Sequence, residues 1–382
     1  MMRSIRPVFA LPPGPAAVIT ATLFAALPSA ADQAERASLT ERVYPAHLAA
    51  QSLVLDVVKA NDRFIAVGQR GHVLISEDGA AWRQSLQVPT RATLNAVTFK
   101  DGRLWAVGHD SVIISSADLG ETWDLQYSDP DARQPLMDVI FWDADSGIAI
   151  GAYSIMMSTG DGGANWLAAS INDYLEEAGD EAGDSTGEAA PDDEEDRLED
   201  DDIGGAADIN AAAEEFVDDC FDYGECHLNQ IVELADGTLL IVAEKGNGYR
   251  SFNRGETWQH FRLPYVGSLF GALIESERCL LAFGLRGHVF RSCNNGTDWQ
   301  AVETGITQNL LGAALSADGA RWVIAGSDGA LLSGTPGATR VAVRRLPDGE
   351  DLAAVLYLDD HLLLAGEDGV KQIPFSAEAS QP

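Results

Sequence analysis

Residues 67–82 read VGQRGHVLISEDGAAW, and this stretch decides the fold. Its pattern predicts a short apolar strand ending at Gly68, a turn, a second strand, and a tight turn that ends at Trp82. The same phrase returns further along the chain, and regular repetition predicts a repeat architecture. The copies are GHDSVIISSADLGETW (108–123), GAYSIMMSTGDGGANW (151–166), RSFNRGETW (250–258) and GLRGHVFRSCNNGTDW (284–299).

The chemistry of one copy explains why it recurs. Val73, Leu74 and Ile75 are aliphatic, as in a strand that is packed on both faces. In the S-x-D-x-G-x-x-W ending, the Asp or Asn accepts hydrogen bonds from backbone N–H groups, and Gly supplies a positive φ. This ending resembles the Asp-box of sialidase-type repeats, which implies a folding device on a propeller rim rather than an active site.

Seven units can be counted along the chain. Turn glycines recur at steps of about 40 residues, with one longer step, and an apolar strand precedes each of them. Seven units of about four strands predict an all-β fold, a seven-bladed β-propeller spanning residues 40–382. The glycines are Gly68, Gly108, Gly151, Gly246, Gly284, Gly326 and Gly366; the strands are 54–58, 94–99, 136–141, 228–232, 269–274, 310–315 and 352–357.

The last unit is incomplete, because little sequence follows Gln372, Ile373 and Pro374. We expect the segment near Val43 to supply its outermost strand, by pairing onto the blade that contains residues 362–364. The propeller would then be closed by strands from both termini, which removes an exposed sheet edge.

The first residues predict an export signal. Arg3 and Arg6 precede an apolar stretch over residues 8–27, which prolines interrupt, and residues 29–31 are small. This pattern predicts a signal peptide over residues 1–31, cleaved near Ala31. The mature chain would then be exported, to the periplasm in a Gram-negative host, and would not span the membrane. An uncleaved membrane anchor is the alternative.

An acidic, low-complexity insertion at 173–219 accounts for the longer step. It contains DDEEDRLEDDD at 192–202, and the whole chain has a net charge of −34. Such a segment buries too little apolar surface to fold, so we expect a disordered loop between blades 3 and 4. The overall acidity argues against binding nucleic acid or an anionic membrane surface.

The four cysteines fit an oxidising compartment. Cys279 and Cys293 flank one predicted hairpin, and Cys220 and Cys226 lie close together after the insertion. We predict the disulfides Cys279–Cys293 and Cys220–Cys226, with free thiols as the alternative. Cys220, Cys226 and His227 lack a fourth ligand for zinc. We expect no metal and no cofactor.

The sequence offers little for catalysis. It has no G-x-S-x-G, Walker or H-E-x-x-H motif. A sialidase-like glycoside hydrolase remains the alternative function, and it would need an arginine cluster and a Tyr–Glu pair. Tyrosines are present, but no Glu is visibly paired with one of them. Those considered are Tyr44, Tyr153, Tyr265 and Tyr357.

Basic residues gather on one predicted face, where the turns between second and third strands meet the blade-to-blade connections. The candidate binding residues are Arg70 and Arg286 in such turns and Arg91 and Arg133 in the connections. Arginine favours bidentate contacts, so this face suits an acidic peptide or a carboxylate. Ordinary solvated loop residues are the alternative. The same turns also contain His72, His109, Lys245 and His288.

The VGxxGxxxxSxDxGxxW repeat around seven blades, behind a signal peptide, resembles the photosystem II stability and assembly factor family. The resemblance implies a non-enzymatic assembly factor that binds a newly made reaction-centre subunit through an arginine patch, with Arg70 and Arg286 as the nearest counterparts. In non-photosynthetic hosts it implies an association with transporters of the resistance–nodulation–division type. The expected partner is therefore a membrane protein or a subunit of a membrane complex. The insertion departs from the family pattern, and we hypothesise that it loosely covers the arginines.

Overall fold

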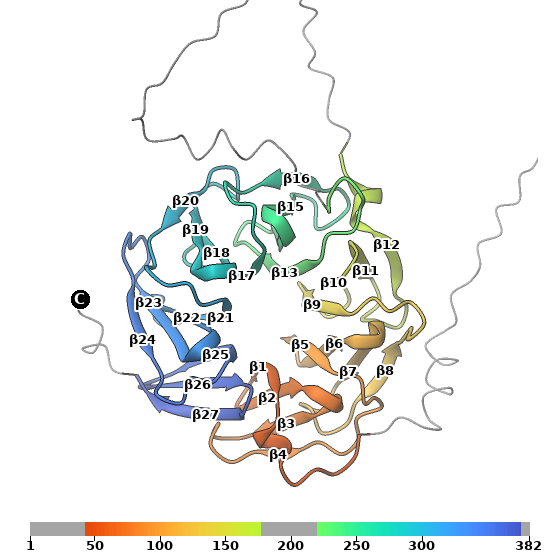
Figure 1. Cartoon of the computed structure of the whole chain (residues 1–382). Helices are drawn as coiled ribbons and strands as arrows, with labels where there is room; N and C mark the ends of the chain where they lie inside the picture. The colour runs from red at the N-terminus through yellow and green to blue at the C-terminus, as the bar shows by residue number, and fades with distance from the viewer. Residues whose placement is uncertain (1–42, 177–219, 376–382) are drawn as a thin grey trace, which may run out of the picture.

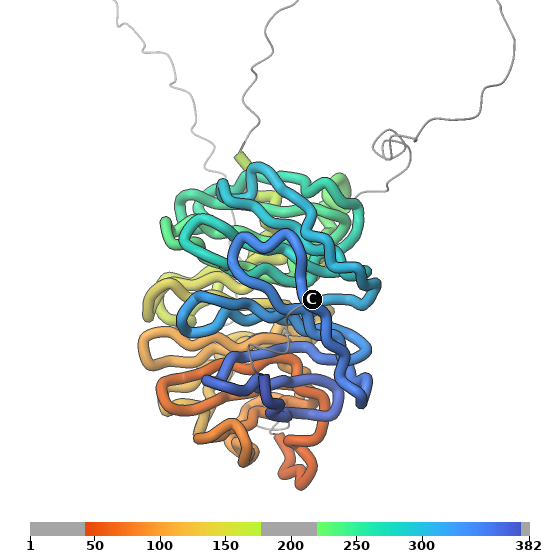
Figure 2. The backbone as a smooth tube through the Cα atoms, turned by 90° about the vertical axis from the view of Figure 1, so that its left-hand side faces the viewer, coloured from red at the N-terminus to blue at the C-terminus, as the bar shows by residue number. Residues whose placement is uncertain are grey.

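The computed structural model describes residues 43–176 and 220–375. The expected signal peptide and most of the acidic insertion lie outside these ranges. The described chain forms seven antiparallel sheets arranged in a ring, which confirms the seven-bladed β-propeller (Figure 1). Seen edge-on, the turns of the blades lie on two opposite faces of the ring (Figure 2).

The strands of a blade are called A to D from the central channel outward, and the turns AB, BC and CD. The bounds for blades 1 to 4 are as follows. Blade 1 has β1 (Val54–Ala60), β2 (Arg63–Gly68), β3 (Val73–Ser76) and β4 (Arg83–Gln84); blade 2 has β5 (Leu94–Lys100), β6 (Arg103–Gly108), β7 (Ile113–Ser116) and β8 (Asp124–Tyr127); blade 3 has β9 (Leu136–Phe141), β10 (Gly147–Gly151), β11 (Ile155–Thr159) and β12 (Leu167–Ser170); blade 4 has β13 (Leu228–Glu233), β14 (Leu239–Ala243), β15 (Asn247–Ser251) and β16 (Gln259–Arg262).

The remaining blades follow the same order, and short 3₁₀ turns occur mainly in the BC turns. Blade 5 has β17 (Leu269–Ile274), β18 (Leu280–Gly284), β19 (Val289–Ser292) and β20 (Gln300–Val302); blade 6 has β21 (Leu310–Leu315), β22 (Trp322–Gly326), β23 (Ala330–Gly334) and β24 (Ala342–Arg345); blade 7 has β25 (Leu352–Leu358), β26 (His361–Gly366) and β27 (Gly369–Pro374). The 3₁₀ turns are η1 (Ala49–Gln51), η2 (Gln69–Gly71), η3 (His109–Ser111), η4 (Ile171–Tyr174), η5 (Glu244–Gly246), η6 (Leu285–Gly287) and η7 (Ser327–Gly329).

The hydrophobic core lies between the blades. Strand B of each blade is apolar and almost fully buried, as in β10, because it is packed on both faces by neighbouring blades. Between blades 2 and 3, for example, Trp105 stacks on Phe141 with ring centroids 3.6 Å apart. Each interface between neighbouring blades thus has its own apolar cluster, which fixes the ring geometry.

The CD turns have the hydrogen bonds that the repeated phrase predicts. In blade 1, Ser76 Oγ accepts a hydrogen bond from Gly79 N at 2.8 Å, and Asp78 Oδ1 accepts from the N–H groups of Ala80 and Ala81 at 2.8 Å each. Trp82 Nε1 donates to Gly79 O at 2.9 Å. The N–H groups of Ala81 and Ala80 hold the pKa of Asp78 below its ordinary value.

The closure of the ring differs from the expectation. In the described chain the sheet of blade 7 has three strands, and the segment near Val43 does not pair with it. Val43 N donates instead to Val88 O at 3.2 Å, and Ala46 N donates to Gln84 Oε1 at 2.8 Å, so this segment follows the outer strand of blade 1. Blades 7 and 1 close the ring by packing side by side.

Both predicted disulfides are present. The Cys220–Cys226 bond has an S–S distance of 2.05 Å, and the Cys279–Cys293 bond has one of 2.08 Å. No helix in the described ranges is long and apolar enough to cross a membrane.

Candidate binding face

The tips of the BC turns have an unusual backbone conformation. The tip residues are left-handed, with φ of 57° at Arg70, 53° at Lys245 and 56° at Arg286. Asp occupies the equivalent tips of blades 2 and 6, and Asp tolerates this conformation well. For a long cationic side chain it costs about 1 kcal/mol. Three tips therefore retain a cationic residue where Gly, Asn or Asp would fit better.

Close backbone packing holds these tips in place. The glycine after each tip lies directly on the next blade-to-blade connection: a Cβ added at Gly71 would fall 2.3 Å from Thr90 O, and one added at Gly287 would fall 2.4 Å from Ile306 O. Only Gly permits this approach at a positive φ. The tip side chains are thus presented from a rigid backbone.

The structure brings Arg70 and Arg91 together at the junction of blades 1 and 2. The Arg91 guanidinium lies 5.0 Å from the centre of the Tyr44 ring, and its Nη1 donates to Tyr44 Oη at 3.2 Å. The Cα of Arg91 borders the Arg70 turn, because it would lie 3.1 Å from a Cβ at Gly71. The Arg91 and Tyr44 side chains are thus in contact, and the backbone of Arg91 borders the turn that carries Arg70.

The other two predicted arginines lie at other junctions. Arg133 is exposed and left-handed, with φ of 53°, in the connection between blades 2 and 3. Arg286 belongs to blade 5, and its backbone N–H donates to Asn309 Oδ1 at 3.1 Å. Blade 5 lies across the ring from blade 1 (Figure 1). The four arginines thus share one face but do not make one cluster.

Several cations of the CD-turn face are engaged in ion pairs, whereas, among the described residues, three arginines of this face are not. On the CD-turn side, Arg63 pairs with Glu77 at 2.8 Å, and Arg291 pairs with the buried Glu275 at 2.7 Å. Within the described ranges, no hydrogen bond or ion pair engages the guanidinium groups of Arg70, Arg133 and Arg286. All three are exposed, so they are available to an external ligand.

Aromatic residues on this face were not predicted as part of it. Tyr265 stacks on His288 with ring centroids 4.1 Å apart. Tyr153 packs edge-on against His227 with ring centroids 5.1 Å apart. Burial raises the pKa of Tyr265, and the Arg286 charge acts in the opposite direction. Tyr153 lies in a BC turn and Tyr265 in a blade-to-blade connection. Because those segments form this face, the sequence positions of the two tyrosines could have predicted that they belong to it.

His72 does not contribute positive charge to the face. It is buried, and its Nδ1 lies 3.1 Å from Ser52 Oγ. Burial and the neighbouring Arg70 charge lower its pKa, so the ring is neutral at pH 7. The basic character here comes from the arginines.

The described residues show no arrangement of the sialidase kind. Tyr44 is bound to Arg91, Tyr265 Oη donates to Leu285 O at 3.0 Å, and Tyr357 lines a hollow between blades 6, 7 and 1. No Tyr in the described ranges is hydrogen-bonded to a Glu, and no group of three or more His, Cys, Asp or Glu there is placed to hold a metal ion.

Two carboxylates line the central channel and were missed by sequence reasoning. Asp56 Oδ2 accepts from Val97 N of blade 2 at 2.8 Å, and Asp138 Oδ2 accepts from Ile231 N of blade 4 at 2.9 Å. Burial raises the pKa of Asp56 to about 6 and that of Asp138 to about 7. The channel cavity has a volume of about 210 Å³. Each carboxylate joins the inner strands of two neighbouring blades by a hydrogen bond, so these contacts give both residues a structural role.

The two flanks of the acidic insertion attach to different parts of the ring. Glu176 accepts hydrogen bonds from Thr257 Oγ1 and Gln259 Nε2, both at 2.8 Å, at the outer strand of blade 4. Ser154 N of the blade 3 BC turn donates to Cys226 O at 2.8 Å. Residues 177–219 lie outside the described ranges, so the proposed cover over the arginines stays a prediction.

Comparison with known proteins supports the fold. The sequence matches no protein-family model and no curated protein. The structure is similar to "YCF48 bound to D1 peptide", with 15% identity, a TM-score of 0.59, and coverage of 89% of this chain and 98% of that chain. It is also similar to YCF48 from Cyanidioschyzon merolae, with 16% identity, the same two coverages and a TM-score of 0.59.

Unrelated propellers match equally well. The β-propeller domain of Cps50 (Swd1) from Myceliophteria thermophila has 13% identity and a TM-score of 0.58, and the match covers 87% of this chain and 98% of that chain. At such identities the similarity shows the propeller fold alone.

Proposed function

We propose that this protein is an exported, non-enzymatic scaffold that binds an acidic segment of a membrane protein through its BC-turn face. The observation that carries the proposal is the set of cations at strained turn tips. Arg70 and Arg286 occupy left-handed positions, are exposed, and have no side-chain partner in the described ranges. Strain that is retained without a structural use suggests function.

The geometry suits recognition of carboxylates. The arginines project from backbones that are already rigid, so little conformational entropy is lost on binding. Tyr44 and Tyr265 add aromatic surface beside Arg91 and Arg286. The similar YCF48 structure contains a bound D1 peptide, which supports a peptide ligand for this fold. The two disulfides support export to an oxidising compartment.

The test is a pull-down from detergent-solubilised membranes of the host, followed by affinity measurements with the captured protein. We expect the triple variant Arg70→Glu/Arg91→Glu/Arg286→Glu to bind roughly tenfold or more weakly than wild type, because each exposed ion pair contributes a few tenths to 1 kcal/mol. The difference should shrink at high salt. Arg278→Glu is the matched control, since Arg278 is an exposed cation of an AB turn on the opposite face. Equal affinity of the triple variant and the control would contradict the proposal.

A further inference from the structure

The outer edge of blade 7 is open. In blade 6, Ala330 to Ser333 of strand C pair with Arg345 to Ala342 of strand D. The equivalent residues of β27 are 370–373, and no described strand pairs with their outer side. Both ends of β27 are contacted, because Gly369 packs on Ala50 O in η1 and Arg344 of β24 donates to Pro374 O at 3.3 Å. An unpaired row of N–H and C=O groups is a template for another strand.

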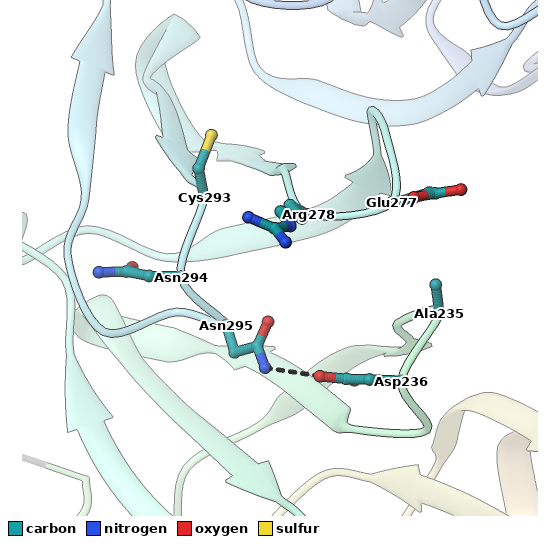
Figure 3. Close-up of a pocket in the computed structure, with 7 residues that line it drawn as sticks. All are labelled: Ala235, Asp236, Glu277, Arg278, Cys293, Asn294 and Asn295. Carbon is teal, nitrogen blue, oxygen red and sulfur yellow. Dashed lines mark hydrogen bonds between the residues drawn. The ribbon is translucent and has the colours of Figure 1, made fainter.

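A hollow lies beside this edge, at a place that recurs between other blades. Between blades 4 and 5 the hollow has a volume of about 550 Å³ (Figure 3). Its walls are the AB turns of both blades, at Asp236 and Arg278, and the CD turn of blade 5, at Asn294 and Asn295. Asn295 Nδ2 donates to Asp236 Oδ2 at 2.9 Å across it.

Between blades 6 and 7 the equivalent hollow is larger, at about 790 Å³. The AB turns of both blades line this hollow as well. The wall that a CD turn of blade 7 would form consists of Phe375 alone in the described ranges. The hollow therefore extends as far as Phe64 and Asp78 of blade 1. In the described ranges blade 7 has neither a CD turn nor a strand D.

The lining of this hollow suits an aromatic side chain. Tyr357 and Phe375 meet edge-on with centroids 5.8 Å apart, and Tyr357 Oη is buried without a hydrogen-bond partner in the described ranges. In blades 1 to 5 the tryptophan at the end of the CD turn packs into the core shared with the preceding blade, as Trp123 does between blades 1 and 2. Neither blade 6 nor blade 7 has a tryptophan at this place in the described ranges.

We propose that an extended segment of a partner polypeptide completes blade 7. It pairs with β27 as a fourth strand and inserts an aromatic side chain beside Tyr357 and Phe375, in the mode of β-strand addition. Arg344 of the neighbouring β24 is exposed and donates to Pro374 O at 3.3 Å, so its positive charge lies beside β27 and favours a segment that also has acidic residues. This surface is separate from the BC-turn face, so the inference does not depend on the proposed function.

The described N-terminal segment of this chain does not occupy the open edge. The nearest N-terminal residues, from Val43 to Ala46, follow blade 1 instead.

The probe for this site is a labelled peptide, GETWDLQY, which copies residues 120–127 of blade 2, and the control peptide is GETADLQY. We expect GETWDLQY to bind the full chain saturably with a Kd below roughly 1 mM. The control peptide should bind roughly tenfold or more weakly, because it lacks the anchor. On binding, those backbone amides of residues 370–373 that do not bond β26 should exchange hydrogen more slowly.

Two matched variants locate the site. Ala317→Trp places a bulky side chain in the hollow from an exposed AB-turn position of blade 6, and it should abolish peptide binding. Ala235→Trp makes the same change at the equivalent turn of blade 4, which borders blade 5, whose strand D is present, and it should leave binding unchanged.

Four results would overturn the proposal. These are no saturable binding of GETWDLQY, equal binding of the two peptides, equal effects of the two variants, and slow exchange in the unliganded protein of those amides of residues 370–373 that do not bond β26. In the last case the chain itself or a second copy fills the edge. The molar mass from light scattering would show which of the two it is.

Discussion

At the scale of single residues, the buried carboxylates of the channel make stability depend on pH. The pKa of Asp138 is raised by burial to about 7 and that of Asp56 to about 6, above the value of about 3.9 in an unfolded chain. Between these limits the folded protein holds protons that the unfolded chain has lost. Their contribution to stability is therefore complete below pH ~4 and is lost as the pH rises to about 7.

We predict that the free energy of unfolding falls by a few kcal/mol between pH 4 and pH 7.5 on account of these two groups. Urea unfolding at several pH values measures this slope. The double variant Asp56→Asn/Asp138→Asn should have a flatter profile in that window. A profile as steep as that of the wild type would show that other groups cause the dependence.

Residue patterns in the sequence predicted the CD turns and the exposed arginines, but not these carboxylates. Ser76, Asp78 and Trp82 make contacts within a few residues of one another, so their spacing alone specifies the turn. Asp138 instead bonds Ile231, which is 93 positions away. Sequence spacing does not encode such a contact. For the same reason the separation of Arg286 from Arg70 across the ring was not foreseen.

At the scale of elements, the two disulfides differ in exposure. Cys293 is exposed at a CD turn, whereas Cys226 is fully buried. A reductant has to reach a sulfur atom to open the bond, so access favours reduction of Cys279–Cys293 first.

We predict that mild dithiothreitol treatment, followed by alkylation and peptide mass analysis, labels Cys279 and Cys293 before Cys220 and Cys226. The variant Cys279→Ser/Cys293→Ser should lose about 3 kcal/mol of stability, since a loop of this length is no longer closed in the unfolded chain. Labelling in the reverse order, or an unchanged melting temperature in the variant, would contradict this account.

The N-terminal segment shows where prediction of elements failed. Ala50 lies four positions before β1, just as Thr90 lies four positions before β5. Both residues pack on the glycine that ends the preceding blade's BC turn, Ala50 on Gly369 and Thr90 on Gly71. The residues before Ala50 were expected to continue onto blade 7, but the Gln84 side chain bonds the backbone of Tyr44 and Ala46. One long-range side-chain contact thus directs the segment along blade 1.

At the scale of the whole molecule, the BC-turn face differs in presenting cations from strained turn tips. On the CD-turn face Arg291 links blades 5 and 6 through Glu275 and Ala338 O, and Arg278 is exposed. Arg70, Arg133 and Arg286 on the BC-turn face remain exposed on rigid tips. The central claim is that the BC-turn face holds the membrane-protein partner.

Site-specific photo-crosslinking in the host's membranes tests that claim most directly. A photoreactive residue is placed next to a tip, at Gln69 or Leu285, and, as the control, at Thr297 in the CD turn of blade 5. We predict that Gln69 and Leu285 cross-link to the same membrane protein, that added salt weakens both cross-links, and that Thr297 gives none. Cross-links that form mainly from Thr297, or partners that differ between the two tips, would contradict the claim.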